Sequence, residues 1–279
     1  MPGVEISPED WYNDTLYYVE DNPMKTMMKP EKMKMLAAVS GLLGALLRWL
    51  LYETGTDEKG LLVTGHWTAI ALWVLTAVYC SAVLLYCRKL TGPGQYRHCY
   101  PASPAAALGC IACGAALALA GLKDWPLAEA PMDMLSAALS LAAAAALVVI
   151  ALCRLLGKMP PFPLHALVCL CLALRMVSRY RAWSSEPQLM DYLFFVLGYV
   201  TLTLSSYQLA AFDAGMGSHR KLWCFGLMAV YFCLTGLYRC GEVPVMAGCA
   251  LWMLLNLPSL RARRERPVLD LETPEPGEG

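Results

Sequence analysis

Ionisable side chains near or within long apolar segments are the residues of this sequence best suited to bind a charged solute. Inserting a charge into a membrane costs free energy, so such a residue marks a candidate functional site. We predict that these groups form a polar outer vestibule for a small charged ligand, with Glu242 among the further charges near its mouth. The alternative is that the arginines extend toward water and pair with nearby carboxylates. The predicted ligand-binding residues are Arg48, Arg175, Arg179 and Asp191.

A second set of polar side chains lies further along the same apolar region. Tyr199, Thr203, Ser206 and Tyr207 follow a three- and four-residue spacing, which predicts that they share one face of a helix. We interpret this face as one wall of a solute pathway. The alternative is hydrogen bonding between helices, which contributes about 0.6–2 kcal/mol per contact.

Signatures of enzyme chemistry are absent from the sequence. It contains neither His-Glu-x-x-His nor Gly-x-Ser-x-Gly, and it has no phosphate-binding Walker loop. Cys110 and Cys113 have redox spacing but lie among alanines, which favours a packing role. The positions of His98 and His219 match no zinc pattern. We therefore predict no catalytic residues, no metal site and no cofactor.

The composition identifies the class of protein that must position these residues. Of 279 residues, 58% are hydrophobic and only 16% are charged, and the mean hydropathy is +0.47. Soluble domains carry about 25% charged residues, so an ordinary soluble protein and a disordered chain are both excluded. The formal net charge is zero, which gives no indication of nucleic-acid binding. The prediction is an all-α polytopic membrane protein with the lipid bilayer as its first partner.

Apolar runs of about 20 residues predict membrane-spanning helices, because lipid offers no hydrogen-bonding partner to the backbone. The sequence contains eight such runs, which predict an eight-transmembrane-helix bundle. Most of the twelve cysteines lie inside these runs, so we predict no disulfide framework. The predicted spans are about 35–52, 66–87, 104–122, 133–156, 163–182, 190–212, 221–239 and 243–260.

The distribution of Lys and Arg predicts the orientation of these spans. Fifteen of the 22 basic residues fall before the first span, in alternate connections and after the last span, whereas five fall on the other side. Cytoplasmic loops carry the excess of Lys and Arg. We therefore predict a multi-pass protein of the cell membrane with both termini cytoplasmic.

The chain divides into three regions. Residues 1–34 form a cytoplasmic N-terminal segment with a short amphipathic helix over 8–20, which either docks a partner or folds against the protein's own loops. Residues 35–260 form the transmembrane domain, and residues 261–279 form a basic and then disordered cytoplasmic tail.

Two short similarities suggest an internal duplication. Residues 45–48 resemble 172–175, and residues 120–123 resemble 235–238, so both pair a span with the fourth span after it. A parallel four-plus-four repeat would produce this pattern, although coincidence in alanine- and leucine-rich helices is the alternative. The small-residue faces of the first, third and fourth spans indicate close packing within the bundle or against another copy.

Residues 181–215 carry the one family resemblance. The stretch from Arg181-Ala-Trp-Ser-Ser-Glu-Pro to Gln208-Leu-Ala-Ala-Phe-Asp-Ala-Gly resembles a segment of uncharacterised multi-span bacterial membrane proteins. The resemblance implies a bacterial plasma membrane and no particular activity.

Two functions remain open from the sequence. The leading hypothesis is binding or translocation of a small solute through the helix bundle. The alternative is a non-transporting subunit, sensor or scaffold that acts through a membrane protein partner or a homo-oligomer.

Overall fold

The computed structural model describes residues 30–55, 65–90, 102–128, 130–183, 189–238 and 241–259, and all regular structure in these ranges is helical. The all-α prediction is therefore confirmed, and each predicted span coincides with one helix. The predicted N-terminal helix and the C-terminal tail lie outside the described residues. The long helices are α2 (Pro30–Thr54), α3 (Trp67–Lys89), α4 (Pro104–Asp124), α5 (Pro131–Leu155), α6 (Phe162–Trp183), α7 (Leu189–Asp213), α8 (His219–Thr235) and α9 (Val243–Asn256). Two short 3-10 helices follow α4 and α9, namely η2 (Trp125–Leu127) and η3 (Leu257–Ser259).

Local signals explain where several helices begin and end. Ser103 caps α4 by accepting a hydrogen bond from the backbone N–H of Ala106 at 3.3 Å, and Pro104 occupies the first turn. Gly157 follows α5 with φ of 65° and Gly215 follows α7 with φ of 75°. These left-handed conformations favour glycine and end a helix.

Six of the helices pack as a closed ring. Each of α4 to α8 contacts the next helix along the chain, and α9 packs against α4 to close the circle. Successive helices run in opposite directions. At each end of the ring, therefore, every second helix begins and the helices between them end. We call the end where α9 begins the Glu242 end, and the end where it finishes the Asn256 end.

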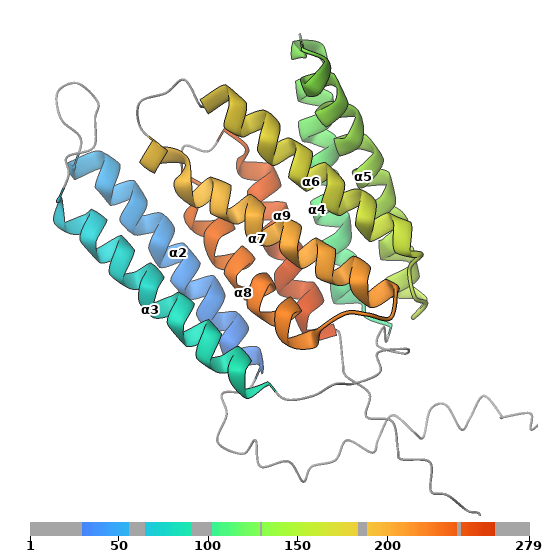
Figure 1. The fold of residues 1–279 in the computed structure, drawn as a ribbon, viewed down its shortest axis with the longest axis horizontal. Helices are drawn as coiled ribbons and strands as arrows, with labels where there is room; N and C mark the ends of the chain where they lie inside the picture. Colours follow the sequence, from blue (N-terminus) through green and yellow to red (C-terminus); the bar gives the residue numbers. More distant parts are fainter. Residues whose placement is uncertain are drawn as a thin grey trace, which may run out of the picture.

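The remaining two helices lie outside this ring. α2 packs against α3 and α8, and α3 packs against α2 and α8, so the pair forms one edge of the molecule (Figure 1). A Cβ added at Gly41 would lie 2.8 Å from Cβ of Leu234, and one at Gly44 would overlap the Thr235 hydroxyl. Glycine therefore permits the close approach of α2 and α8, as expected for helices packed in lipid.

The helix lengths and surfaces match a multi-pass membrane protein. Six helices, α2 to α7, are long and apolar enough to cross a bilayer, and the α9–η3 segment is a shorter apolar helix. Large apolar side chains cover the outside of the α2–α3 pair, including Val39 and Val78, which are 60% and 62% exposed. In water such a surface would be unfavourable, whereas lipid solvates it.

The helix contacts do not follow the predicted four-plus-four repeat. Such a repeat relates α4 to α8 and α5 to α9, so the extensive α4–α9 contact should have an equivalent between α8 and α5. The contact between α2 and α8 should likewise have an equivalent between α6 and α4. Neither equivalent is among the substantial helix contacts of the described residues. The duplication therefore stays a prediction without support from packing.

Candidate functional site

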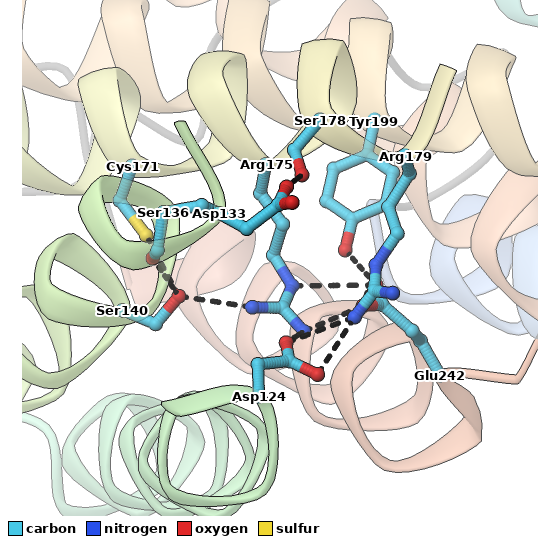
Figure 2. Close-up of polar contacts among 10 residues, drawn as sticks. All are labelled: Asp124, Asp133, Ser136, Ser140, Cys171, Arg175, Ser178, Arg179, Tyr199 and Glu242. Atoms are coloured by element: carbon cyan, nitrogen blue, oxygen red, sulfur yellow. Dashed lines mark hydrogen bonds and ion pairs between the residues drawn. The ribbon is translucent and has the colours of Figure 1, made fainter. Parts of the chain in front are cut away.

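Arg175 is the centre of a buried polar network at the Glu242 end of the ring. Its side chain is 1% exposed, although it carries a full charge. Nη2 donates to Glu242 Oε1 at 2.5 Å and Nε donates to Glu242 Oε2 at 3.3 Å. Nη1 donates to Ser140 Oγ at 3.0 Å, and Nη2 also reaches Asp124 Oδ2 at 2.8 Å. One α6 side chain thus links α4, α5 and the residue before α9 (Figure 2).

Arg179 lies one helical turn after Arg175 and binds the same two carboxylates. Its Nε donates to Glu242 Oε1 at 2.6 Å. Its Nη2 donates to Asp124 Oδ1 at 3.0 Å and to Oδ2 at 2.8 Å. The four-residue spacing places both guanidinium groups on one face of α6. Two cations and two carboxylates therefore balance each other within the network.

Tyr199 and Ser140 complete the network. The Tyr199 hydroxyl, from a fully buried side chain on α7, donates to Glu242 Oε2. Ser140 accepts from Arg175 and donates to its own helix at the carbonyl of Ser136, 2.7 Å away. We call Asp124, Ser140, Arg175, Arg179, Tyr199 and Glu242 the charged site.

The charged site lies well inside the ends of its neighbouring helices. Arg175 is eight residues before the end of α6, and Tyr199 is ten residues after the start of α7. At 1.5 Å per residue, these positions are about 12–15 Å from the helix ends. Glu242 reaches this depth because α9 has only 14 residues and starts late, whereas α6 and α7 have 22 and 25.

The structure does not bring all of the predicted vestibule residues together. Arg175 and Arg179 lie together, as the sequence predicts. Both are paired with carboxylates, as in the alternative interpretation in which the arginines form ion pairs. The described contacts of Arg48 lie elsewhere: Nη1 donates to the Thr235 carbonyl at 3.5 Å, and the guanidinium lies 5.9 Å from the ring centroids of Tyr52 and Phe194. The side chain of Asp191 lies outside the described residues.

The predicted pathway residues do not share one environment. Tyr199 belongs to the charged site, and the Thr203 hydroxyl donates to the Tyr199 carbonyl at 2.8 Å, within its own helix. Ser206 is fully buried, and its hydroxyl has no hydrogen-bond partner among the described residues. Tyr207 is 59% exposed and faces the outside of the bundle. The three- and four-residue spacing therefore does not place all four side chains toward the interior.

Two members of the charged site were missed by the sequence analysis, namely Asp124 and Ser140. Asp124 follows the basic residue Lys123 at the end of α4, on the side where Arg179 also falls. Like Arg179, Asp124 is a charge close to a long apolar segment, so the same criterion would also have selected this carboxylate. Ser140 had no comparable signal, because a serine in an alanine-rich helix is compatible with ordinary packing.

A second group of buried polar contacts lies at the Asn256 end. Arg154, 1% exposed at the end of α5, donates to Asn256 Oδ1 at 3.1 Å and to Ser259 Oγ at 2.6 Å. His165 Nδ1 and Asp213 Oδ2 lie 2.5 Å apart and link α6 to α7. Polar contacts therefore link helices at both ends of the ring, including helices that are not adjacent in it. The part of the chain that the structure describes has no group of three His, Cys, Asp or Glu side chains arranged to hold a metal ion.

No protein-family model matches this chain, and no curated protein or solved structure is detectably similar to it.

Proposed function

We propose that this protein is an eight-span integral membrane protein of the bacterial plasma membrane with both termini in the cytoplasm. The alternating Lys and Arg distribution supports this topology. α8 has 17 residues, and α9 with η3 also covers 17, which corresponds to about 25 Å at 1.5 Å per residue. Each is slightly shorter than the hydrocarbon core of about 30 Å, a mismatch that local thinning of the bilayer accommodates. In this orientation the Glu242 end faces outward.

We further propose that the charged site binds a small anionic solute from the outer side. The observation that carries this proposal is the unequal exposure of its ion pairs. The side chains of Arg179 and Asp124 are 32% and 23% exposed, whereas those of Arg175 and Glu242 are 1% and 6% exposed. The Arg179–Asp124 pair is therefore the accessible side of the network, and Glu242 is its fixed inner anchor.

Binding would proceed by exchange of one anion for another. Asp124 Oδ2 accepts from both guanidinium groups at 2.8 Å and thus occupies the position that a solute carboxylate would take. Planar, paired N–H donors recognise carboxylate and phosphate groups well. Asp124 is the last residue of α4, where a helix terminus can move more readily than a helix interior. Its displacement would expose two arginines to the solute while Glu242 holds their inner sides.

The experiment is a titration of purified protein in lipid nanodiscs with acetate, succinate and inorganic phosphate, followed by calorimetry. Asp124→Asn removes the competing charge, so anion affinity should rise about tenfold, equivalent to about 1.4 kcal/mol. Arg179→Gln should abolish binding. Lys123→Gln is the matched control, because it removes an exposed cation next to Asp124 without touching the network.

Two results would contradict this proposal. If Asp124→Asn leaves anion affinity unchanged, Asp124 does not compete with solute. If Lys123→Gln and Arg179→Gln weaken binding equally, the anions respond only to surface charge, and the charged site serves structure alone.

The alternative function, a non-transporting membrane subunit, sensor or scaffold, is favoured by a different observation. The hydroxyls of Thr201, Thr203 and Ser205 on α7 donate to carbonyls of their own helix at 2.7–2.8 Å, so their protons are already used within the helix and are not offered to a passing solute. Solute translocation requires water to reach Ser206. With the native cysteines removed, Ser206→Cys should react with a membrane-impermeant thiol reagent if a pathway opens, with Tyr207→Cys as the outward-facing control. Absence of labelling at position 206 with or without the anions would favour the partner role.

A further inference from the structure

A third carboxylate, outside the charged site, lies beside it at the Glu242 end of the ring. Asp133 is in the first turn of α5, and its Oδ1 accepts a hydrogen bond from the Ser178 hydroxyl at 2.7 Å. Ser178 lies on α6 between Arg175 and Arg179, and the three- and four-residue spacing from Arg175 places all three side chains on one face of the helix. Figure 2 shows Asp133 and Ser178 next to Arg175.

Asp133 differs from the carboxylates of the charged site in its partners. Asp124 and Glu242 each pair with both arginines. In the ranges that the structure describes, Asp133 forms no ion pair, and its side chain is bound by a neutral hydroxyl. The charges of the two arginines are already balanced by Asp124 and Glu242. Asp133 is therefore a negative charge in excess beside the network.

Asp133 is placed where a solute from outside would meet it early. Its side chain is partly exposed, like those of Ser178, Arg179 and Asp124. Ser140, which binds Arg175, lies seven residues later on α5, about 10 Å deeper in the bundle. The start of a helix carries a partial positive charge, which favours a carboxylate in the first turn of α5.

We propose that the solute of the charged site is a zwitterion, namely an amino acid whose carboxylate binds Arg175 and Arg179 and whose ammonium group binds Asp133. This inference rests on the proposed anion binding at the charged site and adds recognition of a positive charge on the same molecule. Ser178 donates to Oδ1 of Asp133, and a carboxylate accepts at both oxygens, so Oδ2 can accept from the ammonium group.

The balance of charge favours a zwitterion over a simple anion. A simple carboxylate that displaced Asp124 would bring a further negative charge close to Asp133. The ammonium group of a zwitterion compensates this charge, and a hydrogen bond between two charged groups is stronger than one between neutral groups. The arginines therefore select the carboxylate of the solute, and Asp133 selects its amine.

The test compares carboxylates with amino acids of the same chain length, by calorimetry of the full-length protein in lipid nanodiscs. The pairs are acetate with glycine, propionate with β-alanine, and butyrate with γ-aminobutyrate. The series varies the separation of the two charges, which the distance between Asp133 and the arginines should select. At one length at least, the amino acid should bind about tenfold more tightly than its carboxylate, as expected for an added hydrogen bond between charged groups.

Two variants assign this preference to a residue. Asp133→Asn should remove the preference and retain carboxylate binding, because asparagine still accepts from Ser178 but carries no charge. Glu53→Gln is the matched control. Glu53 is an exposed carboxylate near the end of α2, outside the ring and at the same end of the molecule, since Arg48 five residues earlier donates to the Thr235 carbonyl at the end of α8. Its substitution should leave the preference unchanged.

The outcomes separate this inference from the function on which it rests. If the carboxylates bind and no amino acid binds more tightly, the zwitterion is overturned and anion binding at the charged site stands. If neither series binds, both fail. A preference that persists in Asp133→Asn, or that Glu53→Gln removes equally, would overturn the role of Asp133. The comparison in the native-sequence protein decides the substrate class even if a variant fails to fold.

Discussion

Glu242→Gln is the substitution that should most weaken the charged site. Glu242 accepts from Nε and Nη2 of Arg175, from Nε of Arg179 and from the Tyr199 hydroxyl. Glutamine keeps one acceptor oxygen but removes the charge, which leaves two guanidinium groups facing the single carboxylate of Asp124. Because Arg175 is 1% exposed, water cannot solvate the excess charge.

The expected loss of stability follows from this burial. Removing one partner of a buried ion pair costs about 3–5 kcal/mol. The lower part of this range applies here, about 3 kcal/mol, because Arg179 is 32% exposed and keeps both bonds to Asp124. Asp124→Asn is the comparison, and it should cost only about 1–2 kcal/mol because the Asp124 side chain is 23% exposed.

The assay is reversible unfolding in mixed detergent micelles, followed by tryptophan fluorescence. Arg175→Met combined with Glu242→Gln should recover part of the loss, since it leaves Arg179 and Asp124 as a balanced pair. The reasoning would be refuted if Glu242→Gln cost less than Asp124→Asn. It would also be refuted if the two substitutions in the double variant were simply additive.

Two further substitutions test the packing and the network with the same assay. Gly44→Ala should destabilise the protein by about 1–3 kcal/mol, because the new methyl group overlaps the Thr235 hydroxyl across the α2–α8 contact. Gly198→Ala is its control: the nearest neighbours lie 3.5 Å away, so a cost equal to that of Gly44→Ala would contradict the steric argument. Tyr199→Phe should cost about 1–2 kcal/mol by removing one donor from Glu242, and no loss would mean that the hydroxyl does not support the carboxylate.

The helices of this protein could be predicted well from the sequence, and the neighbours of each helix could not. Apolar run lengths locate helices because lipid forces each segment to satisfy its own backbone hydrogen bonds. Hydrophobicity, however, is similar on every lipid-facing helix and does not specify which helices meet. For this reason Arg48 and Arg175 were predicted to share one vestibule, although α2 packs on α8 and α6 packs on α5 and α7.

Which residues form the charged site depends on how far each residue lies from the end of the bundle, and the sequence does not show this. Tyr199 was assigned to a pathway because its spacing from Thr203, Ser206 and Tyr207 predicts one shared helix face. Tyr199 contacts Glu242 only because α9 is short and begins deep in the bundle. Glu242, the residue just before α9, therefore lies level with the interior of α7. Predicting this meeting requires knowing where the turn between α8 and α9 lies, which apolar run length alone does not give.

The attachment of the α2–α3 pair to α8 has a consequence for biosynthesis. Arg48 donates to the Thr235 carbonyl, a residue 187 positions later in the chain. At about 5–20 residues per second, a ribosome needs roughly ten to forty seconds to cover that interval. Throughout it the first hairpin resides in the bilayer without its docking helix, and α4 likewise waits for α9. The contacts of α2 with α8 and of α4 with α9 therefore form only after the later helix of each pair has been synthesised.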